Sequence, residues 1–370
     1  MVNGPELRYA PSEPRPPVKL EFICHAARSF CRAWKKSEAC GEKPMTSKPV
    51  FWVALVAPLF ALTNDAQAQT YPSHPITMVV PAAAGGPTDT IARIITERMR
   101  ASLGQTIIIE NIGTAAGSVA VGRVAHAAPD GYTLSIGNWA THVVNGAIYS
   151  SRFDLVRDLE PIALLSNNPA VVVAKKTMPA NDLKGLIAWL KANPDKASSG
   201  TSGAGGPGHV FGVFFQNITG TRFQFVPYRG GGPAMQDLVA GQIDIIVASP
   251  PDALPHVRAG NIKAYAVTAK TRLAAAPDIP TVDEAGLPGF YTSLWYGLWA
   301  PNGTPKSTIA TLNAAVASAL ADPTVQARLV DLGQEIFSRE QQTPEALGAF
   351  QKAEIDKWWP IIKTAGIKGE

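Results

Sequence analysis

Short apolar runs alternate with amphipathic stretches along the chain from about residue 76 onward. The first apolar run, Ile76–Val80, has the pattern of a strand, and Asp89–Leu103 after it places its apolar residues on one face of a helix that Gly104 ends. Strands that alternate with helices build parallel sheets covered by helices. The pattern therefore predicts an α/β fold with mainly parallel strands.

The same periodicities locate the other elements. Further strands are expected at Ile107–Glu110, Tyr132–Ile136, Ile162–Leu165, Ala170–Ala174, Phe223–Val226, Gln242–Ala248, Ile262–Thr268 and Leu294–Ala300. Further helices are expected at Gly117–His126, Leu183–Ala192, Val210–Thr219, Pro255–Ala259, Lys306–Leu320, Pro323–Asp331 and Thr343–Thr364, with a loop at Gly137–His142. Crossings near residues 170 and 291 predict a discontinuous domain, residues 69–170 plus 292–370, and a second domain, residues 171–291, with a hinge and a ligand cleft between them.

Two glycine-rich segments each join a strand to a helix. The first runs from Pro81 to Asp89 and the second from Ser199 to His209. Such a turn leaves backbone N–H groups without partners at the positive end of a helix dipole, which suits a small anion. Two such turns far apart in the sequence, with no catalytic set between them, predict two domains that hold one small anion.

The first turn supplies candidate donors for a ligand carboxylate, and Pro87 is excluded because it has no N–H. The candidates are the amides of Ala84, Gly85, Gly86, Thr88 and Asp89. The alternative is that Thr88 or Asp89 only caps the helix. A carboxylate at Asp89 would also repel an anion unless it held an ammonium group or a water molecule.

Further candidates come from three other segments. Thr201, Ser202 and Gly203 are expected to bind a second carboxylate or a carbonyl, with His209 as a ligand contact or a capping residue. Asn138, Trp139 and Thr141 follow a strand, and loops at the carboxyl ends of parallel strands face the cleft. Trp139 is expected to pack on the ligand body, and Tyr228 to contact the ligand.

The glycines at 203, 205 and 208 also match the dinucleotide-binding fingerprint. That fingerprint needs an acidic residue about 20 positions further on. The region Arg222–Tyr228 contains none. The sequence therefore argues against a nucleotide ligand.

The N-terminal residues resemble a processed segment. Residues 45–68 contain a basic start, the apolar run Pro49–Leu62 and an Ala-Gln-Ala cleavage site, the pattern of a signal peptide. Its core is shorter than the roughly 18 residues that cross a bilayer. Residues 1–44 are expected to be a spurious or disordered extension. The mature part would be exported to the periplasm as a soluble protein.

Composition narrows the chemistry of the mature part. All three cysteines lie within the extension, at Cys24, Cys31 and Cys40, so no disulfide or thiol chemistry is expected. Basic and acidic residues almost balance in residues 69–370, and no basic run argues for nucleic acid. The chain has neither a G-x-S-x-G elbow nor an H-E-x-x-H pair, and its histidines are scattered. A secreted hydrolase is therefore a weak alternative, and no cofactor or metal is expected.

Several short motifs follow one another in a characteristic order. They are Tyr71–Ile76, Val79–Asp89, Ala128–Leu134, Val226–Gly230, Ala253–Gly260, Pro280–Pro288, Trp295–Leu298 and Ala300–Pro305. Across residues 70–370 the chain resembles the tripartite tricarboxylate transporter substrate-binding proteins of the TctC or Bug type.

The resemblance implies a periplasmic binding protein of type II, with two α/β domains around a small carboxylate ligand and no enzymatic activity. It also implies delivery of the ligand to integral membrane subunits of a tripartite transporter by a monomer. The alternative partner is a sensor kinase, to which the liganded protein would report. Many relatives carry an acid where Ala248 stands, and its loss here favours a carboxylate without an amino group.

Overall fold

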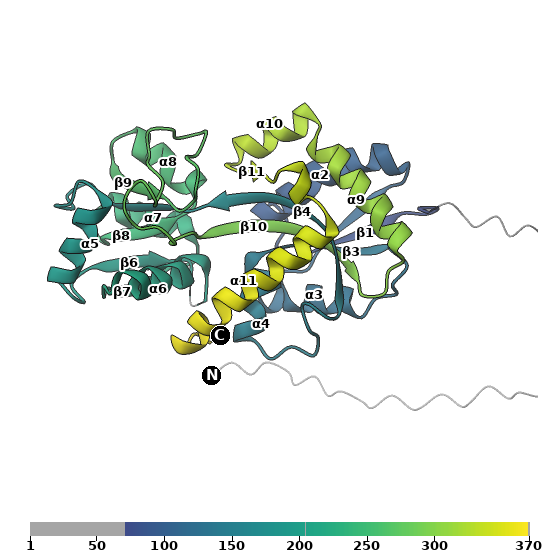
Figure 1. The fold of residues 1–370 in the computed structure, drawn as a ribbon, viewed down its shortest axis with the longest axis horizontal. Coiled ribbons are helices and arrows are strands. Elements are labelled where there is room, and N and C mark those ends of the chain that lie inside the picture. The colour runs from purple at the N-terminus through teal and green to yellow at the C-terminus, as the bar shows by residue number, and fades with distance from the viewer. Residues whose placement is uncertain (1–70, 204, 369–370) are drawn as a thin grey trace, which may run out of the picture. The chain divides into compact units, whose positions relative to one another are not determined.

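A computed structural model describes residues 71–203 and 205–368, which all belong to one structural unit of the chain, Ala68–Glu370. The expected extension, residues 1–44, and the expected signal peptide, residues 45–68, lie outside the described residues. The strands form two sheets, and we call each sheet with its helices a lobe (Figure 1).

The first lobe is built on a six-stranded sheet of order β11-β4-β10-β3-β1-β2. Its strands are β1 (Ile76–Val80), β2 (Ile107–Asn111), β3 (Thr133–Asn138), β4 (Leu159–Pro169), β10 (Ser293–Pro301) and β11 (Glu335–Ile336). Its helices are α2 (Pro87–Leu103), α3 (Ser118–Ala125), α4 (Asn145–Ile148), α9 (Lys306–Leu320), α10 (Pro323–Asp331) and α11 (Pro344–Thr364), with the short turns η2 (Thr114–Gly117), η3 (Ala140–Val144) and η4 (Arg339–Gln341).

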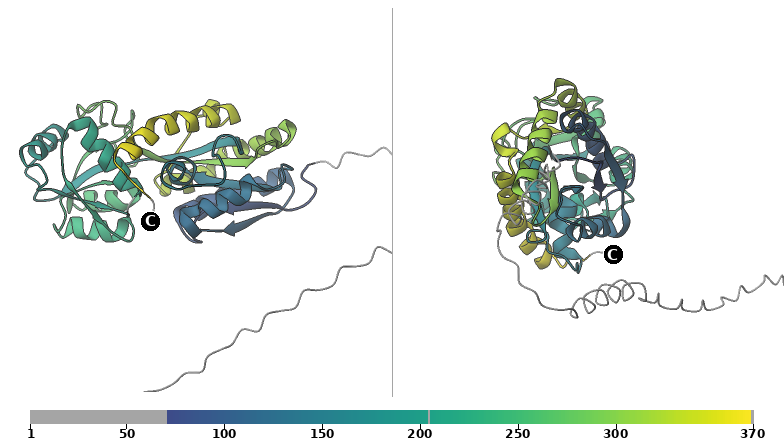
Figure 2. Two further views of the ribbon diagram at one scale, coloured as in Figure 1. Left: turned by 90° about the horizontal axis from the view of Figure 1, so that it is seen from below. Right: turned by 90° about the vertical axis from the view of Figure 1, so that its right-hand side faces the viewer.

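The second lobe is built on a five-stranded sheet of order β7-β6-β8-β5-β9. Its strands are β5 (Val171–Lys175), β6 (Ser198–Thr201), β7 (Gln224–Pro227), β8 (Ile245–Ala248) and β9 (Ile262–Val267). Its helices are α5 (Leu183–Ala192), α6 (Pro207–Thr219), α7 (Gly231–Val239) and α8 (Pro250–Arg258). Helix α11, yellow in Figures 1 and 2, packs on β4 and also contacts α6 of this lobe.

Both sheets are mixed: most strands of each sheet run in one direction, as expected, while β5, β10 and β11 run against them. Strand β1 pairs in parallel with β2 and β3, and β6 pairs in parallel with β7 and β8. Strand β10 runs antiparallel to β3 and β4, and β5 runs antiparallel to β8 and β9. The cause is the exchange between lobes, because the chain leaves the first sheet along β4 and returns to it along β10.

The two crossings are tied together by three residues at the junction of the lobes. Ala170 lies between β4 and β5, Thr268 directly follows β9, and Thr292 directly precedes β10. The N–H of Thr268 donates to the carbonyl of Ala170 at 2.8 Å, and the N–H of Ala170 donates to the carbonyl of Thr292 at 3.2 Å. The hydroxyl of Thr268 donates to both carbonyls, at 3.0 and 2.6 Å. The chain therefore changes lobes through one buried, hydrogen-bonded junction.

Helix ends follow from local sequence. Helices α2 and α6 both begin with proline after glycine and end at a glycine with positive φ, Gly104 at 66° and Gly220 at 65°. Helix α8 begins at Pro250, earlier than expected, because proline is well tolerated in a first helical turn. The segment expected to be a loop after β3 instead forms the helical turns η3 and α4.

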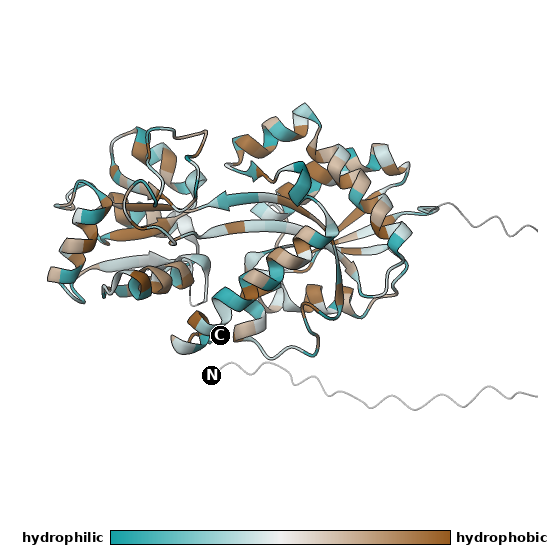
Figure 3. Ribbon diagram, viewed as in Figure 1, coloured by the Kyte–Doolittle hydropathy of each residue, from teal (hydrophilic) through white to brown (hydrophobic). Residues whose placement is uncertain are grey.

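Apolar side chains fill each lobe and also join the two. One buried cluster lies in the first lobe, another in the second, and a third combines residues of both. In the third, Trp139 after β3 packs against Phe211 of α6 and Trp358 of α11, at ring-centroid distances of 4.8 and 5.2 Å. The end of β4 is polar, however, and stands out in teal beside apolar strands in Figure 3.

Candidate functional site

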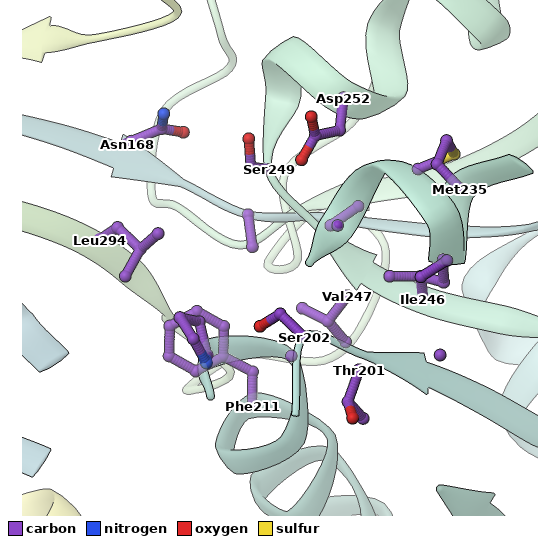
Figure 4. A pocket seen from close by; sticks show the side chains of 17 residues that line it. Asn168, Thr201, Ser202, Phe211, Met235, Ile246, Val247, Ser249, Asp252 and Leu294 are labelled. Atoms are coloured by element: carbon purple, nitrogen blue, oxygen red, sulfur yellow. The ribbon is translucent and has the colours of Figure 1, made fainter. Parts of the chain in front are cut away.

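Two adjoining cavities lie where the two lobes meet. They have volumes of about 140 and 300 Å³ and share Asn168, Ser249, Asp252 and Leu294 in their walls. Figure 4 shows the smaller cavity, with Asn168, Ser249 and Asp252 on one side and Ser202 and Phe211 on the other. Among the described residues that line either cavity there is neither lysine nor arginine.

Each glycine-rich turn reaches one of these cavities. Gly85 and Pro87 of the first turn line the larger cavity, and Ser202, Pro207 and Gly208 of the second line the smaller. The N-termini of α2 and α6, one from each lobe, therefore open on adjoining spaces. Their positive dipole ends favour negative charge in these spaces.

The two turns have the same construction. Each has the sequence Gly-Gly-Pro, in which the first glycine has a positive φ, 80° at Gly85 and 71° at Gly205. Gly86 and Gly206 are the extended N-cap residues. A positive φ favours glycine over residues with a Cβ. The chain thus builds the same kind of helix start in both lobes.

Part of the expected donor set of the first turn is already used. The N–H of Gly85 donates to Oδ2 of Asp89 at 2.8 Å, and the N–H of Gly86 donates to the carbonyl of Ala83 at 3.3 Å. The expectation that these two amides bind the ligand therefore needs correction in this arrangement. The amides of Thr88 and Asp89 are in the first turn, where no carbonyl of the same helix precedes them.

Asp89 holds this turn together. Its side chain is buried and accepts hydrogen bonds from the N–H of Gly85, from Nδ2 of Asn111 at 3.0 Å and from Nε of Arg93 at 2.9 Å. The hydrogen bond from Arg93, more than any other influence, lowers the pKa of Asp89 to about 2. The carboxylate is therefore ionised and fully engaged within the turn, where it accepts from the residue before the N-cap Gly86 rather than from an N–H of the helix.

The segment after β3 fastens the first turn from the other side. Nδ2 of Asn138 donates to the hydroxyl of Thr88 at 3.2 Å, and Oδ1 of Asn138 accepts from the N–H of Thr141 at 3.1 Å. The hydroxyl of Thr141 also lies 2.9 Å from Nδ1 of the buried His142. These polar groups, expected to contact the ligand, instead bind one another.

Trp139 is placed differently from the expectation. Its side chain is 0 % exposed and lies behind Phe211, which itself lines the smaller cavity. The cause is the helical turn that follows β3, which directs the indole into the core between the lobes. Phe211 therefore supplies an aromatic ring to the wall of the smaller cavity, and Trp139 supports it.

Some candidates of the second lobe line the smaller cavity, and others form hydrogen bonds within the protein. Thr201 and Ser202 line the smaller cavity. Nδ1 of His209 accepts from the N–H of Gly205, the residue before the N-cap Gly206, at 3.1 Å. The hydroxyl of Tyr228 donates to Asp237 at 2.7 Å, and burial, followed by this bond, raises the pKa of Tyr228 to about 12.

The structure therefore brings three of the predicted residues into the cavity walls, namely Gly85, Thr201 and Ser202. The remaining candidates lie outside these walls: Ala84, Gly86, Thr88, Asp89, Asn138, Trp139, Thr141, Gly203, His209 and Tyr228. Most of them build or brace the two turns.

Sequence reasoning missed the polar wall that the cavities share. Asn168 is the last residue but one of β4 and is 8 % exposed, and its Oδ1 has no hydrogen-bond partner in the described part of the chain. Asp252 lies in the first turn of α8, and burial raises the pKa of its carboxyl group. A polar run at the end of an otherwise apolar strand was the signal for Asn168. Asp252 was missed because α8 was expected to begin only at Pro255.

The described residues show neither a metal-binding cluster nor a helix that spans a membrane. Within residues 71–203 and 205–368, no group of three or more His, Cys, Asp or Glu side chains is placed to hold a metal ion. In the same residues, every helix is too short or too polar to cross a membrane.

Comparisons with known proteins agree with this architecture. The family described as "Tripartite tricarboxylate transporter family receptor" matches residues 91–367. The periplasmic binding protein BugD is 37% identical, with a TM-score of 0.66, over 81% of this chain and 100% of its own. MatC from Rhodopseudomonas palustris, solved with bound malate, is 40% identical, with a TM-score of 0.66, over 79% of this chain and 100% of its own. A second R. palustris protein, solved with adipate, is 32% identical, with a TM-score of 0.67, over 80% of this chain and 99% of its own. The predicted fold, that of a periplasmic binding protein, is confirmed.

Proposed function

This chain belongs to the tripartite tricarboxylate transporter receptor family, whose members are periplasmic solute-binding receptors, and we propose that it captures a small carboxylate between its two lobes. The observation that carries this proposal is the pair of Gly-Gly-Pro helix starts, one in each lobe, that line adjoining cavities. Helix N-termini bind carboxylates through free amides and the dipole, without a cationic side chain.

The ligands of similar proteins support this chemical class. MatC was solved with malate and the second R. palustris protein with adipate, and both ligands are carboxylic acids. The cavities of this chain combine amides, the hydroxyl of Ser202 and the ring of Phe211. Such walls suit a small acid with an apolar body.

Closure of the two lobes would complete the site. We take the domains to be residues 69–170 plus 292–370 and residues 171–291, hinged at the junction of Ala170, Thr268 and Thr292. Closing them over the ligand removes water and strengthens each contact between an amide and a carboxylate. A membrane partner then recognises the closed form, which the ligand favours because it fits that form better.

The remaining parts of the proposal concern export and partners. Residues 45–68 act as the signal peptide, and the mature chain works in the periplasm as a monomer. It acts as a binding protein rather than an enzyme and delivers its ligand to the integral membrane subunits of a tripartite tricarboxylate-type transporter. A periplasmic sensor kinase is the alternative partner.

The test is thermal unfolding of the purified full chain with a panel of citrate, malate, tartrate, C4 to C6 dicarboxylates, aromatic acids and amino acids. A ligand at 100 times its Kd adds about 2.7 kcal/mol to the free energy of unfolding. At this chain length the melting temperature should rise by several degrees. No rise across the panel, with no acid found in the purified protein by mass spectrometry, would contradict carboxylate capture.

A further inference from the structure

The wall shared by the two cavities holds three polar side chains beside apolar groups, and the carboxylate of Asp252 among them can only accept hydrogen bonds when it is ionised. Asn168, Ser249 and Asp252 line both cavities, so any ligand that extends from one cavity to the other passes them (Figure 4). The turns at either end offer N–H groups, which are donors. The site therefore has donors at its ends, and along one side the acceptor oxygens of Asp252 and Asn168 beside the Asn168 amide and the Ser249 hydroxyl, which can also donate.

Asp252 is the charged member of this wall. It lies in the first turn of α8, and its Oδ2 lies only 2.8 Å from the place where a side chain at Gly231 would begin. Among the described residues lining the cavities it meets neither lysine nor arginine. It therefore has no cationic partner on the side of the ligand; desolvation raises the pKa of its carboxyl group, and a hydrogen bond from the Ser249 side chain offsets part of that rise.

Asn168 supplies a second, independent sign of the same preference. Its side chain is 92 % removed from solvent, since only 8 % is exposed, and Oδ1 has no hydrogen-bond partner within the described residues. A buried acceptor without a partner is costly, and natural proteins rarely leave one. A ligand that brings an N–H or O–H group to this wall would satisfy it.

On the basis of the proposed carboxylate site, we propose that Asp252 and Asn168 select acids whose second polar end is a hydrogen-bond donor, an ammonium or a hydroxyl group. A second carboxylate at this wall would face the charge of Asp252 and the unpaired oxygen of Asn168. Like charges placed together in a binding site cost affinity and serve to reject the wrong ligand. One carboxylate is held by the glycine turns, and the donor end lies along the shared wall.

This inference reverses an expectation drawn from the sequence. Ala248 carries no carboxylate, which in the sequence favoured a ligand without an amino group. The structure places Asp252, one turn into the next helix, in the same cavity wall as Ala248. The carboxylate in this wall therefore comes from α8 and not from the end of β8.

Calorimetric titration of the full chain with matched acids tests the inference. The four-carbon set is succinate, 4-aminobutyrate, 4-hydroxybutyrate and butyrate, and the six-carbon set is adipate, 6-aminohexanoate, 6-hydroxyhexanoate and hexanoate. Within the set that binds, the amino or hydroxy acid should bind at least about tenfold more tightly than the diacid. The amino and hydroxy compounds show whether charge or hydrogen bonding dominates.

Variants assign the effect to the two residues. Asp252→Asn should reduce the ratio of the affinity for the donor-bearing acid to the affinity for the diacid by about tenfold. If this variant does not fold, Asp252→Ser is measured in its place. Asn168→Leu should weaken the donor-bearing acid and leave the monoacid within about twofold. Asp278→Asn is the matched control, because it removes an exposed carboxylate of the same lobe outside both cavity walls.

The outcomes separate the inference from the proposed function. If the diacids bind the wild type most tightly and Asp252→Asn leaves the ratio unchanged, the inference is wrong while carboxylate capture stands. If no acid of either set binds any variant and the wider panel is also silent, carboxylate capture itself fails, and the inference fails with it.

Discussion

The backbone N–H of Gly205 donates a hydrogen bond to Nδ1 of His209, 3.1 Å away in the first turn of α6. At the matching place in α2, the N–H of Gly85 donates to Oδ2 of Asp89 at 2.8 Å. The two turns thus share one geometry but use acceptors of different charge. Burial lowers the pKa of His209, which keeps its ring neutral, whereas Asp89 is ionised. A neutral acceptor leaves the dipole of α6 unopposed.

The first prediction follows from that difference in charge. His209→Asp places a carboxylate at the start of α6 and should weaken carboxylate binding by about tenfold, because its charge neutralises the positive end of the helix dipole and repels the anionic ligand. His209→Asn is the control, since it keeps an acceptor of similar reach without the charge. Calorimetric Kd values for the acid that the panel identifies give the comparison. Equal affinities of the Asp and Asn variants would show that the α6 turn does not hold the anion.

The second prediction distinguishes the role of Trp139, which lies behind the cavity wall, from that of Phe211, which lines the cavity. Trp139→Leu should lower the free energy of unfolding by about 3 kcal/mol, because it opens a void between Phe211 and Trp358. Its effect on the Kd of the bound acid should stay within a few-fold. Phe211→Leu alters the cavity wall itself and should change the Kd more than Trp139→Leu does. Urea unfolding and calorimetry measure the two effects.

A larger effect of Trp139→Leu than of Phe211→Leu on the Kd would support the expectation from the sequence that Trp139 packs on the ligand. If Trp139→Leu abolished binding at concentrations where the variant remains folded, the indole would have to contact the ligand in another arrangement of the lobes. Circular dichroism at the titration temperature is the control for folding.

Periodic segments of the chain were predictable because burial dictates their pattern. The bounds of α5, α9 and α10 agree with those expected, since each has an apolar face and a clear start and stop signal. The glycine turns were also identified from sequence, because a positive φ at Gly85 needs glycine. The strands that run against the rest, β5, β10 and β11, were not predictable, since their direction depends on how the chain exchanges between lobes.

The candidate site was predicted less well, for a physical reason. Sequence shows that Asp89 and His209 follow a glycine turn, but not whether each faces the ligand or its own backbone. Polar residues near a helix start have both options, and satisfying a local N–H is the nearer one. Asn168 and Asp252 come from a crossing strand and a different helix, and only the packing of the lobes brings them together.

The third prediction concerns the junction of the lobes. Thr268→Val keeps the shape of the side chain but removes the hydroxyl that donates to the carbonyls of Ala170 and Thr292. It also leaves the buried hydroxyl of Thr292 without its acceptor. The free energy of unfolding should fall by about 1 to 2 kcal/mol. Thr311→Val is the control, because its hydroxyl bonds an exposed carbonyl within α9 and should cost little. A loss no larger than that of the control would contradict a structural role for the junction.

The fourth prediction is a pH dependence that comes from a buried histidine. His142 is 0 % exposed, stacks on Trp299 at a centroid distance of 3.8 Å and has its pKa lowered by burial to about 3. The unfolded chain binds this proton near pH 6.5, so the folded state loses stability as the pH falls below that value. The loss should approach about 1.4 kcal/mol per pH unit. Asp89, with a pKa of about 2, loses its own contribution only below about pH 4.

Urea unfolding between pH 7.5 and 5 measures this dependence in the wild type and in His142→Phe. Phenylalanine keeps an aromatic ring against Trp299 but has no group to protonate, so its stability should change less across the range. Val143→Ala is the control: it removes buried apolar atoms next to His142 and should lower stability by a similar amount at every pH. If the curves of the wild type and His142→Phe run parallel, the proton that destabilises the folded state is bound elsewhere, and the buried imidazole is not the cause of acid sensitivity.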